Sequence, residues 1–366
     1  MLCRARCLLT VSLVSLLFAF ILISLSSRDP AYSTSSTLLY DDIPINLNVQ
    51  RKILQRREET TIKKTPCRSL PDYLKHKKIV LDPKIIDGVD TMLMFIGYPR
   101  SGHTLIGSLI DAHPNMVIAN EYNILGNWEN YTTEHRNRQY LFEQLYTNSY
   151  NEAHEGDRSS KDCLPKTKYN YLIPNQWQGK FNGKIKIIGD KKGGKTTVLL
   201  QRSEKYWSFL QEIQETVHIP IKFIHTIRNP FDNIATMLLR REFGNNLNWT
   251  EMYKKPLKLS KNMLIQYIRY RMNLATTNAR FLQSFPERVY TLRSEDVVTN
   301  PELELLKICH FLNIECSEKY IKDCTSIVRR SVSRSRNAIV WDMEIKDIMF
   351  DYMKKIPFYK DYKFHE

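Results

Sequence analysis

The sequence predicts an α/β fold in which a P-loop-like parallel sheet is flanked by helices and preceded by an N-terminal transmembrane helix. Short apolar runs with the length of buried strands recur along the chain, and helical patterns lie between them. Strands that alternate with helices in this way form parallel sheets covered on both faces. An uncharged run near the N-terminus adds the membrane helix. The predicted strands are Thr91–Ile96, Met116–Ala119, Ile185–Ile188, Ile221–Ile227 and Val289–Leu292.

The membrane helix is predicted from Leu8–Leu25, which contains no charged residue. A span needs roughly 17–25 apolar residues, and this run is just long enough. Arg4 and Arg6 precede it, so we expect a cytoplasmic N-terminus and a luminal body. A cleaved signal peptide is the alternative. The predicted segments are a cytoplasmic tail (1–7), a signal anchor (8–25), a luminal stem (26–88) and a main domain (89–366).

The balance of charge limits the partners. Of the 366 residues, 54 are Lys or Arg and 39 are Asp or Glu, which gives a formal net charge of +15. Behind a membrane anchor nucleic acid is a poor partner, so we expect a phosphate-rich cofactor or an anionic glycan. A solvated basic surface accounts for most of these charges. Two glycosylation sequons, at Asn130 and Asn248, agree with a luminal body.

Seven cysteines are present, two of them beside the anchor. An odd number in an oxidising compartment leaves at least one thiol unpaired within the chain. Cys309 lies in a helical apolar pattern and is predicted to be that buried free thiol. The predicted bridges are Cys316–Cys324 and Cys67–Cys163.

The first predicted strand leads into a phosphate loop, Gly97–Thr104, with the sequence GYPRSGHT. A loop between a strand and a helix directs backbone N–H groups and the helix dipole at an anion. Gly102 permits close approach of the backbone to phosphate. The spacing matches the nucleotide P-loop, except that His103 replaces the lysine. Arg100 can supply the cation in its place; a loop arginine that forms a salt bridge is the alternative.

A second glycine-rich segment, Gly189–Thr196 (GDKKGGKT), satisfies the P-loop pattern in full. It favours a rival hypothesis, a P-loop kinase or NTPase that binds ATP with Mg²⁺. The predicted luminal location, the earlier phosphate loop and the lack of a strong Walker B strand weaken that hypothesis. A solvated loop is the third possibility.

The strand Ile221–Ile227 leads directly into the sequence RNPFDNIAT, which begins at Arg228. Arg228 at the strand end and Thr236 on the following helix can converge on one phosphate, through charge-assisted bonds and a hydroxyl. Arg240, one helical turn onward, is expected to join them. The sequence Arg-Asn-Pro is common and a weak signal by itself, but its position after a phosphate loop makes it a strong one.

These motifs, in this order, resemble the PAPS-dependent sulfotransferases, and the resemblance covers about Leu93 to Trp341. PRSGHT resembles the family's 5′-phosphosulfate loop, P-[KR]-S-G-T-T, and departs from it at His103. GDK resembles the loop whose lysine reaches the donor sulfate, which is Lys191 here, with Lys192 and Lys195 as rivals. Arg228 and Thr236 resemble the 3′-phosphate motif, where the family has serine. Tyr290–Pro301 resembles a late strand and helix of the family.

The resemblance implies further roles. Arg329–Arg336, a basic, serine-rich segment that includes Ser333, corresponds to a loop that closes over the donor; a disordered tail is the alternative. Pro99–Glu121 is closest to the tyrosylprotein sulfotransferases, through P-R-S-G-x-T-L and D-A-H-P. In those enzymes the catalytic glutamate lies where this chain has Glu121.

The implied enzyme transfers a sulfuryl group from PAPS to a hydroxyl of a luminal glycan or protein tyrosine, without a metal, in the Golgi membrane as a single-pass type II protein. Glu121 would be the base, Arg100 and Lys191 would stabilise charge, and His103 and His113 are rival bases. Predicted donor-binding residues are Arg100, Ser101, Gly102, His103, Thr104, Arg228, Thr236, Arg240 and Ser333. A homodimer is among the expected partners, and a catalytically inactive, membrane-anchored nucleotide-binding protein is the further alternative.

Overall fold

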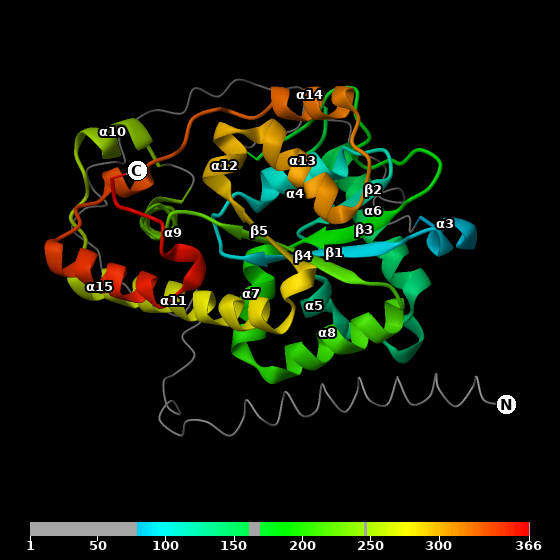
Figure 1. Cartoon of the computed structure of the whole chain (residues 1–366), viewed down its shortest axis with the longest axis horizontal. Helices are drawn as coiled ribbons and strands as arrows, with labels where there is room; N and C mark the ends of the chain where they lie inside the picture. Colours follow the sequence, from blue (N-terminus) through cyan, green and yellow to red (C-terminus); the bar gives the residue numbers. More distant parts are fainter. Residues whose placement is uncertain (1–78, 161–168, 245–246, 366) are drawn as a thin grey trace, which may run out of the picture. The chain divides into compact units, whose positions relative to one another are not determined.

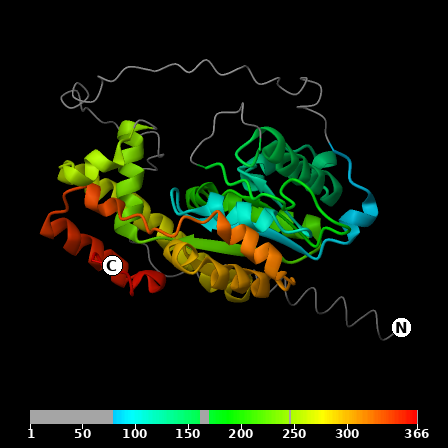
Figure 2. The same ribbon diagram turned by 90° about the horizontal axis from the view of Figure 1, so that it is seen from above.

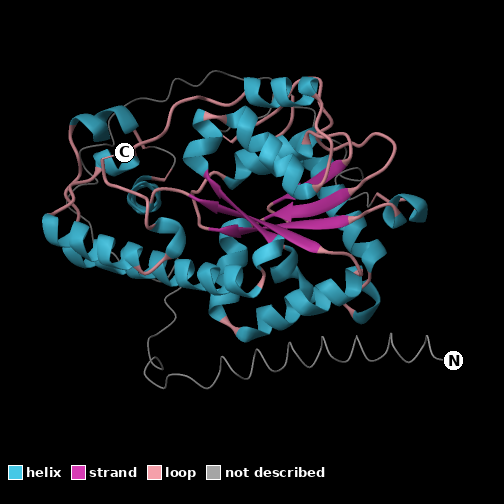
Figure 3. Cartoon of the chain, viewed as in Figure 1, coloured by secondary structure: helices cyan, strands magenta, loops and turns pink. Residues whose placement is uncertain are grey.

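The computed structural model describes residues 79–160, 169–244 and 247–365. They form a five-stranded parallel sheet of the order β2-β3-β1-β4-β5, which lies between two layers of helices (Figures 1 and 3). The strands are β1 (Thr91–Gly97), β2 (Met116–Asn120), β3 (Ile187–Lys191), β4 (Ile221–Ile227) and β5 (Val289–Arg293). The predicted α/β class and its parallel sheet are confirmed.

The helices follow the strands as the alternating sequence pattern predicts. Between β1 and β3 lie α4 (His103–Asp111), α5 (Ile124–Asn127) and α6 (Arg138–Glu155); between β3 and β4 lie α7 (Gly193–Arg202) and α8 (Glu204–Val217). Between β4 and β5 lie α9 (Pro230–Phe243), α10 (Trp249–Lys254) and α11 (Lys261–Ser284). After β5 come α12 (Ser294–Thr299), α13 (Pro301–Leu312), α14 (Glu318–Ser326) and α15 (Met343–Lys354). Five short 3-10 helices complete the described parts of the chain: η2 (Trp128–Asn130), η3 (Thr133–His135), η4 (Pro286–Arg288), η5 (Ser335–Ala338) and η6 (Pro357–Tyr359). A short α-helix, α3 (Pro83–Asp87), precedes β1.

The central strand shows why the sheet is covered on both faces. Side chains alternate across a strand. In β1, Met92, Met94 and Ile96 belong to one apolar cluster with α7 and α8, whereas Leu93 and Phe95 belong to another with α4 and α13. All seven residues of β1 are buried, which explains its continuous apolar sequence.

The segment before β1 packs against the main domain. Leu81 and Ile86, which lie in the range assigned to the stem, are buried in the first of these clusters. The predicted anchor Leu8–Leu25 lies outside the described residues. Within the described residues, no helix is both long and apolar enough to cross a membrane.

The predicted cysteine pairing is wrong where it can be compared. Cys309, predicted free, is joined to Cys316, and the Cα atoms are 6.2 Å apart. The chain reverses at Asn313, which has left-handed backbone after α13, and this brings the two residues together. Among the described residues, Cys324 is the buried free thiol, because α14 turns it into the core against the carbonyl of Leu109. Cys67 and Cys163 lie outside the described residues.

Candidate active site

The loops after β1, β2, β3 and β4 meet at one edge of the sheet, because the carboxyl ends of parallel strands lie together. The register places Asn120 of β2 beside Lys191 of β3, and Gly97 of β1 beside Thr226 of β4. This edge therefore collects residues from motifs that are far apart in the sequence.

The phosphate loop turns sharply into α4. Arg100 and Gly102 both have left-handed backbone, with φ of 67° and 88°. Asn233 on α9 fixes the turn: its Nδ2 donates to the Pro99 carbonyl at 2.7 Å and to Ser101 Oγ at 3.2 Å. The first N–H groups of α4 have no acceptor within the helix. The loop thus presents the N-terminus of α4 and the exposed Arg100 at the sheet edge.

Glu121 and Lys191 are in contact in this site. The Lys191 ammonium donates to Oε1 of Glu121 and, at 3.1 Å, to Oγ1 of Thr104 in the phosphate loop. Its side chain is 1% exposed and passes over Gly107, where a Cβ would lie 2.8 Å from Lys191 Cγ. Burial lowers the pKa of Lys191, and Glu121 opposes that effect. A glycine one turn into α4 therefore makes room for a buried lysine beside the loop.

Asp190 holds the part of the chain that directly follows Glu121. Glu121 itself has left-handed backbone, with φ of 60°. The buried Asp190 carboxylate accepts hydrogen bonds from the N–H groups of Tyr122 at 3.1 Å and Ile124 at 3.0 Å. Burial raises the pKa of Asp190 to about 6, and the backbone N–H groups of Ile124 and Asn123 partly offset this by stabilising the charged form. Asp190 thereby fixes the turn that aims Glu121.

The predicted 3′-phosphate residues also converge. Nη1 of Arg228 donates to Thr236 Oγ1 at 3.2 Å and to the Arg100 carbonyl at 3.1 Å. Its Nη2 donates to Ser335 Oγ at 3.0 Å and to the Ser333 carbonyl at 3.3 Å. Ser333 therefore contributes its carbonyl rather than its hydroxyl, and the serine hydroxyl that binds Arg228 is that of Ser335.

Arg240 lies within electrostatic reach of this group. Its pKa is lowered by burial and by the neighbouring Arg100, and its Nη1 donates to the Gly244 carbonyl at 2.9 Å. The segment after α14 runs across to α9 and α10 and ends in η5, which Figures 1 and 2 both show. The basic segment Arg329–Arg336 therefore does reach the Arg228 site.

The second glycine-rich segment does not form a phosphate loop. Gly189, Asp190 and Lys191 pair within the sheet, because β3 extends three residues beyond the predicted strand. A Cβ on Gly189 would lie 2.0 Å from the Leu93 carbonyl, and one on Gly194 would lie 2.8 Å from the Pro99 nitrogen. These glycines allow close packing. The Thr196 hydroxyl donates to the Lys192 carbonyl at 3.0 Å, so the geometry contradicts the NTPase hypothesis.

Neither rival histidine is placed to act as the base. The His103 ring is buried between Gly97 and Gly193, where a Cβ would lie 2.6 Å and 2.5 Å from its Nε2. Burial, followed by the charge of Lys191, lowers its pKa to about 4. What His103 can offer an anion is its N–H at the start of α4. His113 lies before the other end of β2 and contacts the Glu315 carbonyl at 2.9 Å.

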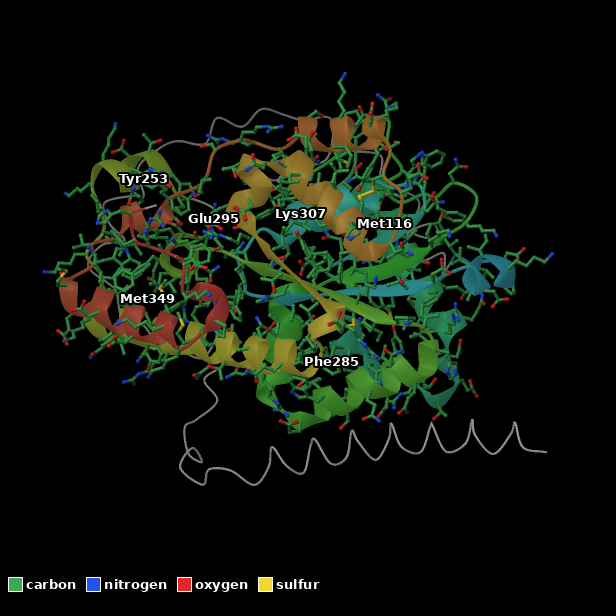
Figure 4. All side chains as sticks on the ribbon, viewed as in Figure 1. Met116, Tyr253, Phe285, Glu295, Lys307 and Met349 are labelled. Carbon is green, nitrogen blue, oxygen red and sulfur yellow. A yellow bond between two sulfur atoms is a disulfide. The ribbon has the colours of Figure 1, made fainter. Side chains whose placement is uncertain are left out.

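Three residues that hold the site were not singled out from the sequence: Asp190, Asn233 and Ser335. A signal existed for Asp190, which is part of GDK, and for Ser335, which lies in the serine-rich segment. Asn233 is itself held by the buried Arg271, whose Nε donates to Asn233 Oδ1 at 2.6 Å. Next to Arg228, the backbone N–H of Asn229 donates to Glu295 at 2.8 Å. Glu295, labelled in Figure 4, also accepts a hydrogen bond from the Tyr362 hydroxyl at 2.9 Å.

Three solved structures similar to this chain are sulfotransferases. One is a mouse enzyme complexed with PAP (10% identity, 77% of this chain and 90% of that chain, TM-score 0.38). The others are an enzyme from Alicyclobacillus acidocaldarius (15%, 75% and 95%, 0.38) and a domain from the curacin biosynthetic pathway (16%, 76% and 94%, 0.38). No curated protein sequence matches this chain significantly.

The family assignment rests on the sequence profile of the sulfotransferase family, which matches residues 93–318, more than half of the chain. This range contains the phosphate loop, Glu121, Lys191 and Arg228. The chain therefore belongs to the sulfotransferase family, whose members take the sulfuryl group from PAPS.

Proposed function

We propose that this protein transfers the sulfuryl group of PAPS to a hydroxyl of a luminal acceptor, with Glu121 as the general base. The observation that carries the proposal is the meeting of four strand ends. They bring a cation (Arg100), a carboxylate (Glu121), a second cation (Lys191) and a phosphate-binding arginine (Arg228) to one edge. A transfer reaction needs the base and the two charge-stabilising cations close to the sulfur atom, and a further cation that holds the nucleotide in place.

The phosphate loop, from Arg100 to Thr104, is assigned to the 5′-phosphosulfate, and Arg228 with Thr236 to the 3′-phosphate. Arg240 and Ser333 border the latter. The four acceptors around the Arg228 guanidinium are two carbonyls and two hydroxyls, all uncharged. The Asp232 carboxylate lies within electrostatic reach of Arg228 but is itself paired with Arg336 at 3.2 Å, so the guanidinium keeps charge for a phosphate, for which bidentate arginine bonds are well suited.

Sulfuryl transfer is an in-line displacement, in which positioning and charge stabilisation dominate catalysis. The acceptor oxygen bonds to sulfur while the bond between sulfur and the bridging phosphate oxygen breaks, and adenosine 3′,5′-bisphosphate leaves. The proton of the acceptor hydroxyl passes to Glu121. Arg100 and Lys191 stabilise the negative charge on the bridging and sulfate oxygens.

For the acceptor we propose a glycan or a protein tyrosine. The likeness to tyrosylprotein enzymes in D-A-H-P does not favour either, because the residues of that motif have structural contacts. Asp111 is buried and accepts hydrogen bonds from Arg158, Ser149 and the Ile118 N–H. These bonds join α4 to β2 and α6, which any enzyme of this fold could require.

For the location we propose the Golgi membrane, with Leu8–Leu25 as a type II anchor and the body in the lumen. Asn130 and Asn248 of the two sequons are both exposed, as glycosylation requires. In intact microsomes we expect the body to resist protease and to carry glycans that a glycosidase removes. Digestion of the body without detergent would contradict this topology.

The test of the reaction uses labelled PAPS with two sets of acceptors, tyrosine peptides and glycans. On the active set, Glu121→Gln is expected to lower turnover by roughly 10²–10⁴-fold while keeping affinity for the bisphosphate. Glu129→Gln is the matched control, because Glu129 is also half-exposed and paired with a lysine, Lys205. Near-normal turnover in Glu121→Gln would refute the assignment. Bisphosphate binding without transfer to either set would favour an inactive binding protein.

A further inference from the structure

Two successive lysines hold one carboxylate in this site. The Lys191 ammonium contacts Oε1 of Glu121, and the Lys192 ammonium contacts Oε2. Successive residues of a strand point to opposite faces, so neighbouring lysines ordinarily diverge. Here β3 ends at Lys191, and Lys192 leaves the strand as the N-cap of α7, with φ of −132° and ψ of 33°. The end of the strand lets both side chains reach Glu121.

The two lysines differ in their surroundings. Lys191 also donates to Thr104 in the phosphate loop, so it lies between the expected position of the donor and Glu121. Lys192 approaches Glu121 from the other side, and its side chain is 25% exposed. Its backbone is fixed, because its carbonyl accepts from the N–H and the hydroxyl of Thr196, both at 3.0 Å. Lys192 is thus anchored independently of the phosphate loop.

We propose that Lys192 is a positioning residue for the transfer reaction, which holds one oxygen of Glu121 when the sulfate of the donor draws Lys191 away from the other. This proposal rests on the assignment of Glu121 as the base. A sulfate beside Thr104 competes with Glu121 for the Lys191 ammonium, since both are anions. Glu121 is half-exposed and has left-handed backbone, so without Lys192 its carboxylate would lose its remaining partner and its orientation.

When the sulfate draws Lys191 away, the change in charge around Glu121 also favours proton transfer. Burial by itself would raise the pKa of Glu121, but Lys191 and Lys192 together hold it below its ordinary value. The other groups that face it are Asp190 on β3 and His103 on α4, whose buried ring has its pKa lowered to about 4 and is neutral at physiological pH. Moving Lys191 to the sulfate removes one cation from Glu121, so the carboxylate becomes a better base as the donor binds.

The experiment follows the titration of Glu121 directly and needs no acceptor. The full chain, in detergent and labelled with ¹³C at the glutamate carboxyl groups, is titrated by NMR, and Glu121→Gln identifies the resonance. PAPS is expected to move the midpoint of Glu121 to higher pH, whereas the bisphosphate, which lacks the sulfate, leaves it unchanged. Lys192→Met also moves the midpoint to higher pH. The control is Lys186→Met, which removes an exposed lysine paired with Asp90 at the opposite end of β3.

Turnover separates this proposal from the assignment on which it rests. On the active acceptor, Lys192→Met is expected to lower kcat by up to about 10²-fold, as a misplaced catalytic group does, with bisphosphate affinity kept. Lys192→Arg restores part of the loss. Lys192→Gln replaces the Met variant if that one does not fold. If the Glu121 titration midpoint and kcat of Lys192→Met equal those of Lys186→Met, the proposed role of Lys192 is wrong. Normal turnover in Glu121→Gln would instead refute the base assignment, with the effect of Lys192 on the midpoint still measurable.

Discussion

The segments that follow β1 and β3 contain similar spacings of glycine, but they differ in the length of chain between strand and helix. Five residues, 98–102, separate β1 from α4, whereas only Lys192 separates β3 from α7. The first segment has room for a loop with two left-handed residues. The second segment continues as a paired strand almost until the helix begins. Gly189–Lys191 therefore lie within the sheet and form no loop.

The glycines of the two segments serve different needs. Gly102 provides a left-handed turn, and a Cβ there would meet its nearest neighbour, Ser294 Cβ, at 3.5 Å. At Gly189 and Gly194, the backbone of a neighbouring segment lies too close to leave room for a side chain. A glycine pattern in a sequence therefore indicates either a turn or close packing, and the extent of the strand decides between them.

The largest expected effect tests this distinction through stability. Gly189→Ala places a Cβ 2.0 Å from the Leu93 carbonyl in the centre of the sheet, and should cost about 3 kcal/mol or more in the free energy of unfolding. Gly102→Ala meets no close neighbour and should cost only the left-handed strain, about 1–2 kcal/mol. Thermal or denaturant unfolding measures both. A stable Gly189→Ala protein that had merely lost affinity for ATP would restore the P-loop interpretation.

The next effect concerns the ligand that the site prefers. Arg228→Ala should weaken affinity for adenosine 3′,5′-bisphosphate by about 1.5–3 kcal/mol, because it removes a charged hydrogen-bond donor. Thr236→Ala should cost less, and Thr236→Ser little. Calorimetry measures each affinity, and Arg280→Ala, which removes an exposed arginine paired with Glu204, is the control. A thermal shift with ATP–Mg²⁺ larger than that with the bisphosphate would contradict the sulfotransferase site.

The sequence predicted all five strands because each is a short segment rich in apolar residues, the pattern of a buried parallel sheet. It ended β3 too early, at Ile188, because Asp190 and Lys191 look like loop residues. In the fold both are buried: Asp190 is compensated by backbone N–H groups, and Lys191 by Glu121 and Thr104. Compensation of this kind depends on partners more than sixty residues away, which no local pattern reveals.

The site was predicted best where one motif contains all of its parts. Arg228 and Thr236 are eight residues apart and do meet. Ser335 was missed because its position depends on η5 packing against α9, where its hydroxyl donates to the Asp232 carbonyl at 2.8 Å. The cysteines were mispaired for a related reason. Spacing alone does not show that the chain reverses at Asn313 or that Cys324 turns inward.

The smallest expected effect returns to the phosphate loop, where His103 stands in the place of the family's threonine. Burial lowers the pKa of His103 from 6.5 to about 4, so the unfolded chain binds more protons here than the folded chain between these values. Its contribution to stability is present above pH 6.5 and is lost as the pH falls toward 4. His225 acts in the same direction, and Asp190, whose pKa is raised to about 6, acts in the opposite direction. His103→Thr should therefore reduce the stability lost between about pH 7 and pH 5 by about 2 kcal/mol. Denaturant unfolding at the two pH values measures this, with the exposed His310→Thr as the control.

Because the His103 ring lies between two glycines under the loop, His103→Thr should also keep turnover on the active acceptor. Loss of turnover with an unchanged pH dependence of stability would mean that the His103 ring takes part in the reaction, as the rival base to Glu121.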